Sequence, residues 1–130
     1  MPKVIRRADC GNSPKNLLVE ALAIALETSN STRVGKLVSD DVRWLRVGHG
    51  AVIDGKESVR LELSAPERQS PLTVTIEHVL SHGKSGACSG TVTLAADSTS
   101  AFCHVFEFAS AKGDRVAAIT SFIISTEAMT

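Results

Sequence analysis

A histidine flanked by aromatic residues is the first candidate for chemistry in this sequence. The stretch 101–108 alternates two sets of side chains, and successive side chains of a β-strand point to opposite faces of a sheet. One of the two sets consists of Phe102, His104, Phe106 and Phe108. An imidazole at a pocket among phenyl rings can donate, accept or remove a proton. It can equally be a core histidine that makes one hydrogen bond and otherwise packs, and the sequence leaves both interpretations open.

A second group of candidates lies earlier in the chain. Trp44 and Arg46 share one face of an expected strand, and His49 follows in a turn flanked by glycines. Arg46 cannot act as a base near neutral pH, but its guanidinium would favour a carboxylate or an enolate-like oxygen as ligand. Two alternatives remain for Arg46, namely a solvated side chain or an ion pair with Asp40 or Glu57. Trp44 is either a wall on which a ligand stacks or simply a large core residue.

The sequence gives little support to metal binding, to a catalytic cysteine or serine, or to phosphate binding. His78 and His82 have the spacing of a helical metal site, but in a strand they would lie roughly 13 Å apart, too far for one ion. Cys88 and Cys103 lie on expected neighbouring strands, and the sequence gives no sign of a base or a helix N-terminus placed to activate either thiol, so both are expected to be small core residues. The chain also lacks a Gly-x-Ser-x-Gly nucleophile elbow and a glycine-rich phosphate loop. We therefore expect no metal and no cofactor.

The elements that must position these residues begin with two helices. Asn12 or Ser13 can cap a helix over 15–28, which Pro14 starts well because its missing N–H costs nothing there. The apolar residues of that helix wrap more than half of its circumference, which predicts cover on several sides. A shorter helix over 32–38 is expected next, and the polar residues 39–41 predict a turn after it.

Strands and a third helix follow. The residues 42–47 are rich in strand formers, and a short extended piece at 51–53 predicts a small hairpin. Asp54 and Glu57 have the spacing of a capping box for a helix over 56–64. Four long extended runs complete the chain, at 72–82, 86–95, 100–110 and 115–125.

The short links between those runs predict antiparallel neighbours, and helices followed by a meander predict an α+β domain with its helices on one sheet face. No repeat or linker divides the chain. We predict an N-terminal arm, a single domain and a C-terminal tail, at 1–12, 13–125 and 126–130.

The composition narrows the classes of partner and compartment. The chain has 130 residues, 43% of them hydrophobic, and its 14 Lys and Arg residues balance 14 Asp and Glu residues. This balance gives no support to nucleic acid or an anionic membrane as partner, and with 4% aromatic residues and no Tyr a base-stacking platform is not expected. Three cysteines without Cys-x-x-Cys spacing, the absence of an apolar signal sequence and the short apolar run at 17–26 predict a cytoplasmic protein.

This order of elements resembles the nuclear transport factor 2-like (cystatin-like α+β) superfamily, which includes ketosteroid isomerases, limonene-epoxide hydrolases and SnoaL-type polyketide cyclases. The similarity covers roughly 13–125 and looks closest to uncharacterised bacterial members. The segments that carry it are 40–44, 54–60, 101–108, 112–116 and 119–122. The resemblance implies a curved sheet and helices that enclose a conical apolar cavity, and a homodimer formed through the outer sheet face. Apolar residues expected on that face are Val79, Val105 and Ile124.

The resemblance also bears on the site. It places His104 near the oxyanion donor of ketosteroid isomerases, but Arg46 near their general-base aspartate, so that mechanism does not carry over unchanged. The tyrosine of those isomerases and the Asp-Arg-Asp set of limonene-epoxide hydrolases have no counterparts here. We predict His104 and Arg46 as catalytic candidates. The expected ligand-binding residues are Trp44, His49, Phe102, Phe106 and Ser121.

The function expected from these residues is that of a pocket protein for a small, largely apolar carbonyl or carboxylate compound. An enzyme of this kind would work by proton transfer, as an isomerase, a lyase or a cyclase. The alternative is a non-catalytic ligand-binding, dimerisation or protein-interaction module. The sequence does not decide whether the protein is a catalyst.

Overall fold

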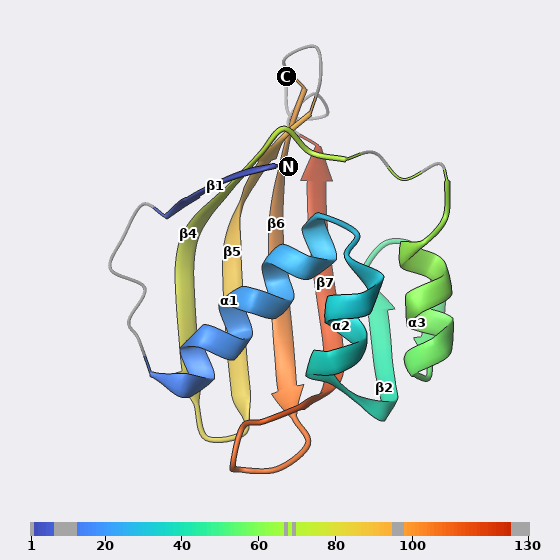
Figure 1. Ribbon diagram of the computed structural model, residues 1–130, viewed down its shortest axis with the longest axis vertical. Coiled ribbons are helices and arrows are strands. Elements are labelled where there is room, and N and C mark those ends of the chain that lie inside the picture. The colour runs from blue at the N-terminus through green and yellow to red at the C-terminus, as the bar shows by residue number, and fades with distance from the viewer. Residues whose placement is uncertain (1, 7–12, 67, 69, 95–97, 126–130) are drawn as a thin grey trace.

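The fold is a single sheet with its helices on one face. The structure is a computed structural model that describes residues 2–6, 13–66, 68, 70–94 and 98–125. Its helices are α1 (Pro14–Glu27), α2 (Ser31–Leu37) and α3 (Lys56–Leu63). Its strands are β1 (Lys3–Arg6), β2 (Val38–Arg46), β3 (Val52–Asp54), β4 (Thr73–His82), β5 (Ser85–Thr93), β6 (Thr99–Phe108) and β7 (Val116–Ser125). Within the described residues the sheet has seven strands in the order β1-β4-β5-β6-β7-β2-β3, and the α+β class is confirmed (Figure 1).

The sheet is mixed. The strands β4 to β7 form the expected antiparallel meander, whereas β1 pairs in parallel with β4 and β2 pairs in parallel with β7. Both parallel pairs join strands that are far apart in the sequence, with at least one helix between them, as parallel pairing requires. The N-terminal arm expected over 1–12 therefore includes an edge strand, while residues 7–12 and the tail 126–130 lie outside the described residues.

Helix α1 forms as its sequence predicts. The Ser13 side chain accepts a hydrogen bond from the Asn16 backbone N–H at 3.2 Å, and Pro14 occupies the first turn. The helix packs on β4 and β5, and its buried apolar residues include Val19, Leu22 and Leu26 (Figure 1). None of the helices in the described ranges is long and apolar enough to cross a membrane.

The turn expected at 39–41 is wrong. Strand β2 begins directly at Val38, which is buried and pairs with Val116 of β7. The register between β2 and β7 shifts between Val38 and Arg43, so the polar residues 39–41 lie in an irregular part of the strand. Burial of a β-branched residue and pairing with β7 thus override the local turn preference of the sequence.

The capping box expected at α3 is also wrong. The residue before the helix is Gly55, with φ of 92°, and no side chain caps the helix start. Asp54 instead belongs to β3, and its carboxylate accepts a hydrogen bond from Arg43 Nε at 2.8 Å across the β2–β3 pair. The cross-strand ion pair and the left-handed glycine place Asp54 outside the helix.

A register shift in β4 decides which side chains face the core. The shift falls between Ile76 and His78, and it leaves both Ile76 and Val79 buried. Val79 is therefore not on the outer face, which corrects one of the three residues expected there. A Cβ at Gly90, on the neighbouring strand, would overlap the carbonyl oxygen of Thr75, so only glycine fits beside this irregularity.

Candidate active site

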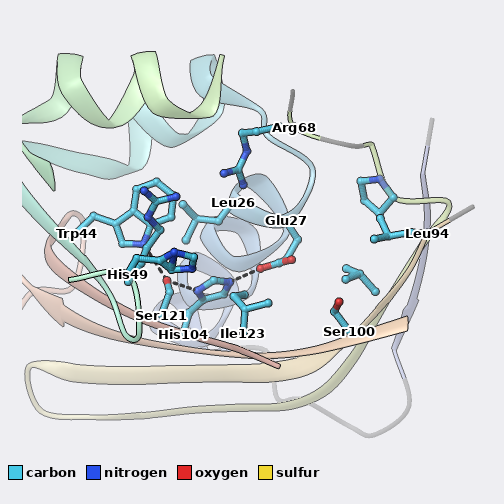
Figure 2. A pocket seen from close by; sticks show the side chains of 13 residues that line it. Leu26, Glu27, Trp44, His49, Arg68, Leu94, Ser100, His104, Ser121 and Ile123 are labelled. Carbon is cyan, nitrogen blue, oxygen red and sulfur yellow. Dashed lines mark hydrogen bonds and ion pairs between the residues drawn. The ribbon is translucent and has the colours of Figure 1, made fainter. Parts of the chain in front are cut away.

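A pocket of about 440 Å³ lies against the inner face of the sheet, next to the C-terminal end of α1. Its wall combines apolar and polar side chains from several elements (Figure 2). The apolar part consists of Leu26, Trp44, Pro71, Val92, Leu94 and Ile123. The polar part consists of Glu27, Arg46, His49, Arg68, Ser100, His104 and Ser121.

Strand register explains why residues far apart in the sequence meet on this wall. Ser121 of β7 lies opposite Arg46 of β2 on one side and opposite His104 of β6 on the other. Directly paired residues point to the same face of a sheet, so these three side chains form one row on the inner face. Trp44, two residues before Arg46, points to the same face.

A continuous hydrogen-bond chain runs along this row. Trp44 Nε1 donates to Ser121 Oγ at 2.9 Å. Ser121 Oγ in turn lies 2.6 Å from His104 Nδ1, and His104 Nε2 lies 2.6 Å from Glu27 Oε2 (Figure 2). The chain thus joins β2, β7, β6 and the last residue of α1.

The side chains of this hydrogen-bond chain are almost completely buried. His104 and Ser121 are 1% and 2% exposed, and the side chain of Glu27 is 12% exposed. The ring centroid of Phe102 lies 5.3 Å from that of His104, and the Phe106 ring stacks on the imidazole at 6.1 Å. Hydrogen bonds among groups so far from water are shielded from competition, so each partner holds the next in place.

Phe102 and Phe106, expected to bind a ligand, are packed in the core and do not line this pocket. They share the face of His104, as the alternation predicts, but they lie on either side of His104 along β6 and are not part of the pocket wall. Trp44, His49 and Ser121 do lie on the wall, together with Arg46 and His104.

Donor and acceptor chemistry limits where the protons of the chain can sit. The Trp44 indole can only donate, so Ser121 Oγ must accept, and the serine has one hydrogen left to give. With a neutral His104, that hydrogen points to Nδ1, and Nε2–H donates to the Glu27 carboxylate. With a charged His104, both ring N–H groups donate, and the Ser121 hydroxyl hydrogen is released toward another acceptor. Both arrangements take Glu27 as a carboxylate, and in both the Nε2–H group of His104 donates to it.

Within this hydrogen-bond chain, Glu27 is therefore the residue with an atom left to contact a ligand. Both ring nitrogens of His104 are occupied by protein partners, whereas Glu27 uses Oε2 for His104. Sequence reasoning missed Glu27 because it ends a largely apolar helix. One signal was present: a carboxylate in the last turn of a helix meets the negative end of the helix dipole, an unfavourable position that calls for a reason.

Arg46 lies over the indole of Trp44, with its guanidinium carbon 5.3 Å from the ring centroid. Its ion-pair partner is Glu62 of α3, with Nη1 to Oε2 at 3.4 Å. Asp40 and Glu57, the partners considered from the sequence, pair with other cations. Stacking and pairing both hold Arg46 at the pocket wall.

Arg68 is a second guanidinium that sequence reasoning missed. It comes from the segment between α3 and β4, and its Nε donates to Ser29 Oγ at 2.8 Å. Figure 2 shows its side chain pointing into the pocket, above Glu27 and His104 in this view. An arginine in a long connection between two elements carried no distinguishing signal in the sequence.

Comparison with known proteins bears on the fold. No family model matches the sequence, and no curated protein matches it either. A candidate ketosteroid isomerase from Kribbella flavida matches with 21% identity and a TM-score of 0.67, over 84% of this chain and 76% of that chain. A nuclear transport factor 2-like protein of unknown function from Burkholderia xenovorans matches with 13% identity and a TM-score of 0.71, over 85% and 82% of the two chains.

A third structure is an epoxide hydrolase from M. tuberculosis that resembles limonene-epoxide hydrolases, with 20% identity and a TM-score of 0.66, over 84% of this chain and 81% of that chain. Two further neighbours are also nuclear transport factor 2-like proteins of unknown function. At these identities the likeness concerns the fold: this chain has the nuclear transport factor 2-like fold.

Proposed function

We propose that the protein is an acid–base enzyme that moves a proton on a small, largely apolar compound carrying a carbonyl or carboxylate oxygen. One observation carries the proposal: Glu27 lies on the wall of a pocket with apolar and polar sides, at the end of a buried hydrogen-bond chain. A carboxylate held in this way has a fixed orientation toward a ligand. Such pre-positioning is what general-base catalysis requires.

The proposed reaction is an isomerisation. Glu27 removes a proton from a carbon next to the carbonyl, and the electrons of that C–H bond move onto the carbonyl oxygen through a new C=C bond. In a substrate with a C=C bond between its β and γ carbons, the carboxyl group then returns the same proton to the γ carbon. The double bond thereby moves next to the carbonyl group, the C=O bond is restored, and no co-reactant is needed. Arg46 supplies positive charge on the pocket wall for the oxygen anion, and a Ser121 hydroxyl released by His104 can donate to it.

In this proposal His104 acts through Glu27 and is a positioning residue. Its Nε2–H orients the carboxylate, and the Trp44–Ser121 pair fixes the other side of the ring. The structural neighbours support the general class: a candidate ketosteroid isomerase and an epoxide hydrolase have this fold. They do not name a substrate for this chain, because a fold of this kind hosts many activities.

Proton exchange provides a test that does not require the natural substrate. The protein is incubated in D₂O with a panel of small cyclic ketones, and NMR follows the loss of α-hydrogen signals. We expect exchange above the buffer rate, and Glu27→Gln should slow it by about 10²-fold or more, the usual contribution of a general base. Glu107→Gln is the matched control, since Glu107 is exposed on the opposite face of β6.

Exchange at the buffer rate with every ketone, or equal rates for wild type and Glu27→Gln, would contradict the proposal.

A second candidate function is non-catalytic ligand binding. The observation that favours it is that every polar atom of His104 already has a protein partner, as in a core histidine. Ligand binding without exchange would support this second candidate.

A further inference from the structure

The two arginine side chains of the pocket differ in whether a carboxylate pairs with them. Arg46 is paired with Glu62, and its group packs on an indole. Arg68 donates through Nε to the uncharged Ser29, and among the described residues it forms no ion pair. The pocket therefore presents one guanidinium whose charge no described carboxylate balances by direct pairing.

The other charges of the wall restrict what Arg68 can take. Glu27 is the carboxylate on this wall, and His104 holds one of its oxygens. A second negative group on a ligand would find no unpaired Lys or Arg among the described wall residues, because Arg46 is paired with Glu62, and the like charge of Glu27 would repel it. A ligand with a single negative group can place it on Arg68.

The remaining wall sets the shape of the ligand. Pro71, Val92, Leu94 and Ile123 supply an apolar surface. A space of about 440 Å³ holds a compact body of moderate size. Pockets that combine an apolar body site with one charged group usually orient their ligand through that group.

We infer that the ligand is a monocarboxylate with a compact apolar body, whose carboxylate binds the guanidinium of Arg68. The planar guanidinium matches a carboxylate through two parallel N–H···O contacts, and with Nε engaged by Ser29 the two terminal nitrogens supply them. The inference rests on the proposed function in taking this pocket as the ligand site, and it narrows the substrate class to acids.

The test measures binding of cyclohexanecarboxylate and of cyclohexanecarboxamide, which has the same shape without the charge. Isothermal titration or NMR titration gives both dissociation constants. We expect the wild type to prefer the carboxylate, and Arg68→Gln to weaken carboxylate binding by about 10- to 100-fold, the range of a hydrogen bond to a charged group. Amide binding should stay unchanged, and Arg68→Lys should restore part of the loss.

Arg115→Gln is the matched control, because Arg115 is an exposed arginine outside the pocket wall. It should leave both constants unchanged. Equal binding of acid and amide by the wild type, no binding of the acid, or an unchanged acid affinity in Arg68→Gln would each overturn the inference. Circular dichroism of each variant shows whether a loss of binding comes from misfolding, and Arg68→Lys then decides the role of the charge.

Glu27→Gln separates this inference from the proposed function. The variant should keep or improve its affinity for the carboxylate, because a negative charge is removed from the wall. Carboxylate binding that depends on Arg68, without proton exchange, would leave the inference standing and overturn the catalytic role of Glu27. Proton exchange on ketones without a binding preference for the acid would support the catalytic role of Glu27 and overturn the inference about Arg68.

Discussion

At neighbouring positions of strands β6 and β7, the two faces of the sheet reverse the usual distribution of polarity. On the inner face, His104 and Ser121 are almost completely buried. On the outer face, one residue further along each strand, Val105 and Phe122 are 38% and 42% exposed. An ordinary antiparallel sheet puts its polar residues outside and its apolar residues inside. Buried polar groups and exposed apolar groups are the informative exceptions, and here the same two strands carry both.

The inner exception is stable because its polar atoms find partners. Ser121 accepts from Trp44 and contacts His104, and His104 contacts Glu27. The aromatic rings around the imidazole then pack without leaving a polar atom unsatisfied. The exposed apolar residues of the outer face are not covered by any other part of the described chain. The difference teaches that the buried polar residues of β6 and β7 find their partners within the protein, whereas the outer apolar residues are suited to contact with another surface.

The largest effect is expected from truncation of the inner packing. Phe106→Ala removes a fully buried ring that stacks on His104, and large-to-small core changes of this type cost about 3–5 kcal/mol. Val105→Ala, its neighbour on the outer face, should cost less than about 1 kcal/mol. Urea unfolding of the two variants measures both free energies. Similar losses would show that the two faces do not differ in packing.

An intermediate effect is expected from the polar chain. Ser121→Ala leaves the Trp44 N–H and His104 Nδ1 without their buried partner, which should lower the free energy of unfolding by about 1–3 kcal/mol. Thr120→Ala, next to it on the outer face of β7, is the matched control and should cost less than about 1 kcal/mol.

The same pair of variants tests whether the chain is more than packing. NMR of the imidazole nitrogens should show a changed proton arrangement at His104 in Ser121→Ala and none in Thr120→Ala. An unchanged His104 signal in Ser121→Ala would mean that the serine does not determine which ring nitrogen carries the proton.

Much of this comparison could be predicted from the sequence. Alternation along 102–108 assigns His104 to the inner face and Val105 to the outer face, because strand geometry has a period of two. Cap and turn chemistry predicts α1 and the four-strand meander. These features depend on neighbouring residues only, so they are readable from one chain.

The rest depends on contacts between distant segments. Glu27 reaches His104 only because α1 crosses the sheet, and Arg68 reaches the pocket from the connection after α3. Val79 turns inward because of a register shift in β4, which no local pattern in the sequence indicates. Tertiary pairing therefore decides the partners of the site, while local patterns decide its strands.

The smallest effect on stability is expected from a charged residue introduced on the outer face. The same change is the sharpest test of what that face does. The homodimer expected from the sequence stays a prediction, and the exposed apolar residues on β2, β4, β6 and β7 are where we expect it to form. They include Leu45, Leu80, Val105, Phe122 and Ile124. Val105→Lys should change the unfolding free energy of the isolated chain by only about 0.5 kcal/mol, as is usual at an exposed site.

Its effect on association should be much larger, because two copies related by a two-fold axis would each bring the new charge to the same interface. Light scattering after gel filtration should show a dimer for the wild type and a monomer for Val105→Lys. Leu61→Lys is the matched control, since Leu61 is an exposed leucine on α3 and not on the outer face of the sheet, and it should leave the dimer intact. A monomeric wild type would contradict the prediction, and the outer apolar face would then need a different partner to explain its exposure.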